Sequence, residues 1–320
     1  FAAAISLFAE FEAVISARRE RASNDQLAAI LHRLTGHSES GLRKALGPES
    51  TLISSGIMSV KSSICDIESK LELMDGLGGR LLQAFACDQA LTEQFLKPVA
   101  KGTLALEAYP HLKSDIAISR EFLEGVLKNK TPGSNILFYG PPGTGKTEMA
   151  NALARALNVE IFEVAFSDSD GDPIRGGARL CAYSLCQRLL ARRANVILMF
   201  DEIEDVFPSN DGFLSMLFGE NSGNAKSLGK AWINRTLENN PVPAIWITNN
   251  SSIDSAYLRR FDYSIRFPIP PQKVRLGIAR HHLQEFNPPE EWLERIAANE
   301  SVSPAQYQRA AKVARLASKG

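Results

Sequence analysis

An eight-residue run near the middle of the chain has the composition and spacing of a phosphate-binding loop: Gly140, Pro141, Pro142, Gly143, Thr144, Gly145, Lys146 and Thr147. An apolar stretch at residues 136–139 precedes the run, and an amphipathic stretch that starts at Glu148 follows it, which is the strand, loop and helix context that such a loop requires. Its glycines let backbone N–H groups surround phosphate oxygens, and the N-terminus of the helix adds partial positive charge. We therefore predict that these eight residues, together with Glu148, bind a nucleotide.

Four side chains at and beyond this loop are suited to metal-assisted phosphoryl transfer. We expect Lys146 to bridge the β- and γ-phosphates and the Thr147 hydroxyl to ligate Mg²⁺. Asp201 and Glu202 directly follow an apolar run, so both carboxylates emerge at the carboxyl end of a predicted parallel strand, where ligands bind in such sheets. We predict that Asp201 holds Mg²⁺ and that Glu202 polarises the attacking water. The chain has no Asn-Lys-x-Asp motif that reads guanine, so ATP is the predicted substrate.

The elements that must position these side chains show the pattern of a parallel sheet covered on both faces. From about residue 113 to 270, short apolar runs alternate with amphipathic stretches. After the prolines at 268, 270 and 271, three helices are predicted at residues 272–286, 290–299 and 304–318. The predicted strands lie near residues 136–139, 161–165, 196–200, 244–248 and 264–267. The predicted fold class is α/β: a helical N-terminal domain at 1–112, a five-stranded parallel nucleotide-binding domain at 113–270, and a C-terminal helical lid at 271–320.

The two loops together resemble those of the AAA+ ATPases, and the resemblance covers roughly residues 115–320. The run at 140–147 is similar to the Walker A motif of that family, and Phe-Asp-Glu-Ile-Glu-Asp at 200–205 is similar to its Walker B motif. Asn249 follows a predicted strand and resembles the residue called sensor 1, which implies that it helps Glu202 to hold the water. The resemblance also implies ATP and Mg²⁺ as cofactors and a homo-oligomeric ring, a hexamer, of a bacterial type with a helical N-terminal domain.

Two further segments are interpreted through the same resemblance. Arg259 and Arg260 resemble the arginine-finger segment, in which one subunit reaches the γ-phosphate bound by its neighbour, and either arginine fits that role. Ile174 and Gly176 align with the loop that unfoldases of the family present to a central pore, although residues 167–177 contain no aromatic residue. The lid helix has no obvious equivalent of the family's sensor 2 arginine at its start; Arg309 is a weak substitute, and as a lone helix charge it is expected to face solvent.

The first 112 residues carry no catalytic motif and show apolar residues at helical spacing at 3–15, 27–34 and 67–85. A helix at 24–34, a turn at Gly36, a helix at 38–46 and a strand at 51–60 would follow the order of winged-helix modules. Residues 1–115 contain twelve Lys or Arg against fourteen Asp or Glu. Since DNA readers are usually basic, we expect this domain to contact protein rather than nucleic acid.

The composition of the whole chain narrows the class of function. Lys plus Arg and Asp plus Glu both number 36, so no net field draws the protein to nucleic acid or to a membrane surface. Four cysteines without a CxxC pair favour reduced thiols and a cytoplasmic location. We therefore expect an ATPase that remodels an unidentified protein client or adaptor. A nucleotide-gated interaction switch and a DNA-associated motor or loader are the two alternatives.

Overall fold

The structure is a computed structural model that divides the chain into two compact units. The larger unit includes residues 98–163, 193–203 and 236–317, and the smaller one includes residues 21–97 and 164–192. Within these units the structure describes residues 21–48, 50–54, 58–61, 65–66, 70–73, 95–99, 102, 104–165, 176–203, 236–251 and 258–317.

Five parallel strands form the centre of the larger unit, and they confirm the five predicted strands to within one residue at each end. They are β6 (Asn135–Tyr139), β7 (Glu160–Val164), β8 (Val196–Phe200), β9 (Ala244–Thr248) and β10 (Tyr263–Arg266). Their hydrogen-bonded order is β10-β6-β9-β8-β7, with Tyr139 paired to Thr248 and to Arg266. Every residue of β8 and β9 is buried, which explains why these strands are continuously apolar instead of alternating.

A sixth strand, β5 (Leu96–Pro98), extends the sheet beside β7 and corrects the predicted count of five. The Ala165 N–H donates to the Phe95 carbonyl and the Val99 N–H donates to the Ile161 carbonyl, so β5 runs antiparallel to β7. The sequence pattern does not predict this strand, because three residues that include a lysine and a proline carry neither alternation nor an apolar run. An edge strand tolerates proline, since one of its sides needs no N–H donor.

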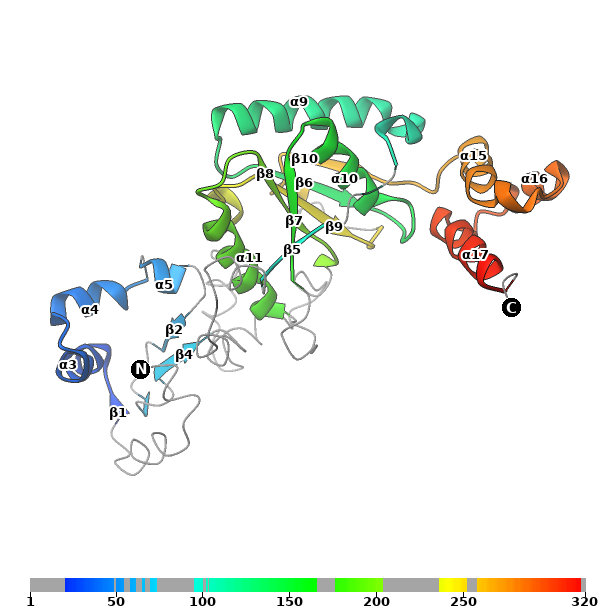
Figure 1. Cartoon of the computed structure of the whole chain (residues 1–320). Helices are drawn as coiled ribbons and strands as arrows, with labels where there is room; N and C mark the ends of the chain where they lie inside the picture. Colours follow the sequence, from blue (N-terminus) through cyan, green and yellow to red (C-terminus); the bar gives the residue numbers. More distant parts are fainter. Residues whose placement is uncertain are drawn as a thin grey trace. The chain divides into compact units, whose positions relative to one another are not determined.

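Helices α9 (Lys113–Asn129) and α10 (Lys146–Ala156) pack on the sheet of the larger unit (Figure 1). Two short 3-10 helices, η1 (Leu106–Ala108) and η2 (Pro110–Leu112), lead into α9. One hydrophobic core joins these elements and contains Leu112, Ile116, Leu123, Ile136, Phe138, Met149, Leu153, Ile197, Ile245, Ile247 and Phe267. The core therefore fixes the start of α10, and with it the loop after β6, against the ends of the strands.

The lid consists of α15 (Gln272–Leu283), a 3-10 turn η4 (Gln284–Phe286), α16 (Glu290–Ala298) and α17 (Pro304–Ala317), drawn in orange to red in Figure 1. These ranges confirm the three predicted helices. Arg275 is 3% exposed, and its guanidinium donates to the carbonyls of Ala297 at 2.8 Å and Pro270 at 2.7 Å. This buried guanidinium therefore holds α15 against the end of α16 and against the proline segment that leads into the lid.

The smaller unit contains the helix pair that the sequence predicts. The helix α3 (Asn24–Thr35) starts at a capping box between Ser23 and Gln26. Its C-cap is Gly36, which adopts a left-handed φ of 73° without strain because glycine has no Cβ. It is followed by α4 (Glu39–Ala45). Leu27 and Leu31 of α3 pack with Met58 and Leu71, so this unit has a small core of its own.

After α4 the smaller unit differs from its prediction as a mostly helical domain. Instead of a strand at 51–60, the chain forms α5 (Thr51–Ser54) and then β2 (Met58–Val60). The strand β2 pairs antiparallel with β4 (Leu71–Leu73), inside the range 67–85 that helical spacing predicts to be a helix. Pairing across the sequence buries Met58 and Leu71, and this gain overrides the local period. Residues 3–15 lie outside the described residues.

The described part of the smaller unit contains a further strand pair and a further helix. The strand β1 (Arg21–Ala22) pairs antiparallel with β3 (Cys65–Asp66), and α11 (Gly176–Leu190) is a separate helix. Burial raises the pKa of the Cys186 thiol of α11, which keeps it protonated and unreactive. Across the described ranges of both units, no helix is long and apolar enough to span a bilayer.

Candidate active site

A cavity of about 1050 Å³ lies within the larger unit, at the carboxyl ends of β6, β8 and β9. It is lined by the phosphate-binding loop, by the residues that follow β8 and β9, by the segment before α9, and by α15 and α17 of the lid. Predicted site residues that line it are Pro142, Gly143, Thr144, Gly145, Lys146, Thr147, Glu148, Asp201, Glu202 and Asn249. The fold therefore brings residues from three distant parts of the sequence to one cavity.

Two glycines of the loop are required by its backbone path. Gly140 has a φ of +141°, and a Cβ there would overlap the Phe267 carbonyl, because β10 ends directly beside the start of the loop. Gly145 has a φ of +92°, and a Cβ there would lie 2.9 Å from the Tyr109 hydroxyl oxygen. Both positions exclude ordinary side chains, which leaves the backbone N–H groups free to face a ligand.

Lys146 starts α10 and is 4% exposed. Its ammonium donates to the carbonyls of Gly140 at 2.9 Å and Pro141 at 2.8 Å. The Thr144 hydroxyl also donates to the Pro141 carbonyl, at 2.9 Å, and closes the loop around the ammonium. A buried cation at the start of a helix, beside a glycine-rich loop, is a site for an anion with several oxygens, and the triphosphate of a nucleotide fits it.

The Thr147 hydroxyl donates to Asp201 Oδ2 at 2.9 Å. This contact joins the loop after β6 to the end of β8, so the two predicted metal ligands lie side by side. Two hard oxygen ligands next to a phosphate site fit Mg²⁺, which usually takes one or two protein oxygens, phosphate oxygens and water. Among the described residues, no group of three or more His, Cys, Asp or Glu gathers to form a cage for a softer metal.

Glu202 and Asn249 lie at the same edge of the sheet and line the cavity. The Glu202 N–H donates to Asp201 Oδ1 at 2.8 Å, and Glu202 itself has a φ of +54°. A non-glycine residue in this left-handed region costs on the order of 1 kcal/mol, and such strain gathers at functional sites. The sequence predicts the position of Glu202 but contains no signal for this conformation.

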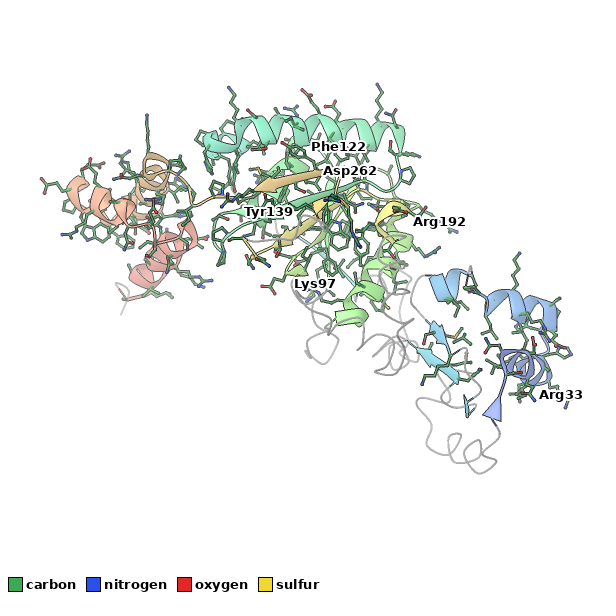
Figure 2. All side chains as sticks on the ribbon, turned by 180° about the vertical axis from the view of Figure 1, so that it is seen from behind. Arg33, Lys97, Phe122, Tyr139, Arg192 and Asp262 are labelled. Atoms are coloured by element: carbon green, nitrogen blue, oxygen red, sulfur yellow. The ribbon has the colours of Figure 1, made fainter. Side chains whose placement is uncertain are left out.

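Arg259 and Arg260 do not line the cavity of their own chain. They precede β10, which runs parallel to β6, so they lie at the amino edge of the sheet while the phosphate-binding loop lies at the carboxyl edge. Four strand residues separate the two edges by about 13 Å at roughly 3.3 Å per residue. Figure 2 shows the two ends of this strand pair, with Asp262 labelled at the amino edge and Tyr139 at the carboxyl edge.

Several residues of the cavity are not predicted by sequence reasoning. They come from the segment before α9 and from the lid, and they include Tyr109, His111, Lys273, His281 and His282. The sequence assigns residues 104–111 to the N-terminal domain, and no motif in this segment signals a site. Arg309 is exposed, as predicted, and it also lines the cavity. Ile174 lies outside the described residues.

Burial shifts the titration of three of these side chains. Burial, and then the Glu148 charge, raises the pKa of Tyr109 above its ordinary value, so its hydroxyl stays protonated and donates to the Gly145 carbonyl at 3.0 Å. Burial also lowers the pKa of His111, and burial followed by the neighbouring His281 lowers the pKa of His282. Both imidazoles are therefore neutral over a wider pH range than a free histidine.

Comparison with known proteins agrees with this geometry. Residues 136–269 match the family model described as ATPase family associated with various cellular activities (AAA). The chain is 32% identical over 171 residues to the proteasome-activating nucleotidase of Methanoculleus marisnigri, covering 49% of this chain and 38% of that protein. It is 35% identical over 170 residues to the proteasome-activating nucleotidase of Thermococcus onnurineus, covering 49% and 39%.

A third relative carries a different name. The ATPase histone chaperone abo1 of Schizosaccharomyces pombe is 32% identical over 186 residues, which cover 54% of this chain and 15% of that protein. The chain thus spans less than half the length of each of these three curated relatives.

Proposed function

We propose that this chain, whose residues 136–269 match the AAA family, is an AAA+ ATPase that hydrolyses ATP with Mg²⁺ in a homo-oligomeric ring to remodel a protein partner. The main support for the proposal is the hydrogen bond from Thr147 Oγ1 to Asp201 Oδ2 at 2.9 Å, next to a loop in which Lys146 is buried. A nucleoside triphosphate and its metal ion need an ammonium, a hydroxyl and a carboxylate close together. A glycine-rich turn with only a structural role does not require them.

The reaction follows from the side chains of the cavity. The loop amides and Lys146 hold the triphosphate, with the ammonium exchanging a carbonyl of Gly140 or Pro141 for a phosphate oxygen. Thr147 and Asp201 would hold Mg²⁺, which neutralises charge on the phosphate oxygens when bound. Glu202 accepts a proton as the water oxygen bonds the γ-phosphorus, the bond to the bridging oxygen breaks, and ADP leaves with that electron pair. Asn249 orients the same water.

The position of the arginine pair supports an oligomer. Since Arg259 and Arg260 lie at the edge of the sheet away from their own loop, an arginine of this pair that stabilises a transferred phosphoryl group would act on the site of an adjacent copy. A closed ring, a hexamer, gives every copy one such neighbour. This assignment is independent of which of the two arginines reaches the phosphate.

A protein client is supported by the names of the relatives, which refer to proteasome activation and to a histone chaperone. The smaller unit is our candidate for client or adaptor binding, and the domains at 1–112, 113–270 and 271–320 remain the proposed division. The absence of an aromatic residue from 167–177 favours a second candidate, a nucleotide-gated switch that assembles with ATP and releases on hydrolysis without threading a chain. A DNA-associated motor or loader and the cytoplasmic location both stay predictions.

Phosphate release from ATP by the purified chain, with Mg²⁺ or with a chelator, tests the activity. We expect Mg²⁺-dependent release that falls at least about 100-fold in Asp201→Asn, since charge neutralisation and positioning carry this reaction. The matched control is Glu121→Gln, an exposed acid on α9 outside the cavity. No release by a folded, assembled wild-type chain would refute the proposed ATPase.

Purification of partners with an ATP-trapped variant distinguishes remodelling, a nucleotide-gated switch and a DNA loader. We expect a Glu202→Gln chain to retain a protein client with ATP, and a Lys146→Ala chain to retain none. Stimulation of the wild-type ATPase by the trapped client supports remodelling. Retention without stimulation supports the switch, and stimulation by DNA instead supports the loader.

A further inference from the structure

A buried tryptophan in the middle of β9 contacts two segments that carry functional side chains. Trp246 is 0% exposed. The centroid of its ring lies 5.0 Å from that of Phe200, its register partner in β8, and 6.1 Å from that of Phe261, which it meets edge to face. Phe200 directly precedes Asp201 of the candidate active site, and Phe261 directly follows the arginine pair.

The indole N–H of Trp246 makes a second link toward the arginine pair. It donates to Asn135 Oδ1 at 2.9 Å, in a buried hydrogen bond. The backbone of Asn135 is paired in turn with Asp262, the residue after Phe261. The Asn135 N–H donates to Asp262 Oδ2 at 2.7 Å, and the Asp262 N–H donates to the Asn135 carbonyl at 3.0 Å. Trp246 therefore supports residues 261–262 both through its ring and through its N–H.

Filling the core of the sheet does not by itself require a tryptophan in β9. Its neighbours Ile245 and Ile247 are buried and purely apolar. A buried indole needs an acceptor for its N–H, and the Asn135 side chain, 1% exposed, provides one. Phenylalanine would keep an aromatic ring but would remove the donor to Asn135 Oδ1. Both links to residues 261–262 thus depend on the indole of Trp246.

The support that Trp246 gives to the two functional segments is unequal. Asp201, which follows Phe200, is held independently by the Thr147 hydroxyl at 2.9 Å and by the Glu202 N–H at 2.8 Å. The arginine pair, in contrast, precedes residues 261–262, which contact Trp246 directly or through one residue. A misplacement of about 1 Å can cost a catalytic group on the order of 100-fold in rate. Loss of the indole should therefore affect the arginine pair more than the carboxylates.

We propose that Trp246 is a positioning residue for the arginine pair: its ring holds Phe261 and its indole N–H holds Asn135, so that the pair reaches the γ-phosphate bound by an adjacent copy. This proposal rests on the proposed oligomeric ATPase and deepens it, because it names what fixes the arginines. A core residue of one copy then affects hydrolysis in its neighbour and leaves nucleotide binding in its own copy unchanged.

Turnover and ADP titration of an assembled Trp246→Phe chain measure the effect. We expect turnover to fall about 10- to 100-fold, as it does when a catalytic group is slightly misplaced, and ADP affinity to stay native. This loss is smaller than the factor of roughly 10³ to 10⁵ that the arginine itself supplies. Trp292→Phe is the matched control, since Trp292 is 38% exposed on α16 and does not line the cavity. It should leave both quantities native.

Mixed assemblies show in which copy the defect acts. A Trp246→Phe chain should have a competent site and misplaced arginines, like a double Arg259→Ala, Arg260→Ala chain. Glu202→Gln chains have intact arginines, so mixing them with Trp246→Phe chains should raise activity above that of either variant alone. Mixing Trp246→Phe with the double arginine variant should give no gain, because neither chain supplies a well-placed arginine. A general loss of stability would not produce this selectivity.

Phe261→Leu is a second variant for the same test. It removes the ring contact with Trp246 and leaves the bond from the indole to Asn135 in place. Phe261 is partly exposed, so the smaller side chain disturbs the core less than a change at Trp246 does. We expect a smaller loss of turnover, native ADP affinity, and recovery with Glu202→Gln chains alone. This variant decides the proposal if Trp246→Phe does not fold.

Three results would overturn the proposal while the ATPase stands. The first is native turnover in folded Trp246→Phe and Phe261→Leu chains. The second is a loss of ADP affinity as large as the loss of turnover, which would make Trp246 a structural residue only. The third is recovery with the double arginine variant instead of Glu202→Gln, which would place the effect in the same copy, through Phe200. If Glu202→Gln and the double arginine variant do not complement each other, the proposed arrangement of copies is itself refuted.

Discussion

The two edges of the central sheet satisfy their polar groups in opposite ways. At the amino edge, a buried amide network is complete: Asn135 Nδ2 donates to Leu237 O at 2.8 Å and to Asn240 Oδ1 at 3.0 Å, and Asn135 Oδ1 accepts from Trp246 Nε1 at 2.9 Å. At the carboxyl edge, Glu148 and His111 each keep a buried atom without a partner among the described residues. A complete network stabilises one arrangement of the core, whereas a buried polar atom without a partner costs free energy.

The amino edge also fixes the arginine pair. Phe261 follows Arg260 directly, and the centroid of its ring lies 6.1 Å from the centroid of the Trp246 ring. Asp262 then accepts from the Asn135 N–H through Oδ2 at 2.7 Å, and its own N–H donates to the Asn135 carbonyl at 3.0 Å. Thus one edge holds the phosphate chemistry of its own copy, and the other presents cations whose position fits the chemistry of a neighbouring copy.

The largest effect should come from removing the two arginines at the amino edge of the sheet. We predict that a double Arg259→Ala, Arg260→Ala chain loses a factor of roughly 10³ to 10⁵ in turnover but keeps its affinity for ATP, since an arginine finger supplies that much in related phosphoryl transfers. Turnover and ATP titration on the assembled variant measure both quantities.

Mixing decides whether the cations act between copies. Glu202→Gln chains have intact arginines and a disabled site, and the double arginine variant has the reverse. Mixed assemblies should therefore be more active than either variant alone. If subunit exchange is demonstrated and activity does not rise, the arginine pair acts within its own chain or is structural.

The carboxyl edge is tested by Glu202→Gln. We predict that hydrolysis slows by about 10² to 10⁴, the range expected for loss of a general base, while ATP still binds because Lys146, Thr147 and Asp201 are unchanged. Single-turnover phosphate release and equilibrium ATP binding report the two effects, with Glu121→Gln as the matched control. A native rate in Glu202→Gln would assign the base to another group.

The wall between the loop and Tyr109 is tested by a pair of glycine substitutions. Gly145→Ala places a methyl group 2.9 Å from the Tyr109 hydroxyl oxygen at a φ of +92°, so we predict at least a 10-fold loss of ADP affinity, about 1.4 kcal/mol. Gly125→Ala in α9 is the control, because no atom lies within 4 Å of the added carbon. It should raise stability by about 0.5–1 kcal/mol in denaturant unfolding. Equal ADP affinities would show that Tyr109 yields easily.

The smallest predicted effect belongs to Asp262→Asn. The side chain keeps its size but loses a charge-assisted bond to the Asn135 N–H, so we expect about 1–2 kcal/mol less stability in urea unfolding. Turnover should fall several-fold because the arginine segment is held less firmly, while ADP affinity at the opposite edge stays native. A loss of ADP affinity as large as the loss of turnover would show that the two edges are not independent.

The sequence by itself determined the phosphate-binding loop, the pair Asp201 and Glu202, and the five parallel strands. These features are local: a glycine-rich loop needs a strand before it and a helix after it, and buried strands are continuous apolar runs. The lid helices followed from helical spacing and from the prolines that precede them.

The tertiary structure alone decided which residues meet. It placed Tyr109 against the loop and His111 in the lining of the cavity, gave Glu202 its positive φ, and left Glu148 Oε2 without a partner among the described residues. It also added β5 and turned residues 71–73 from a predicted helix into a strand. The physical reason is the same in each case: these outcomes depend on pairing, packing and hydrogen bonding with residues far away along the chain, which a local pattern of residue types does not encode.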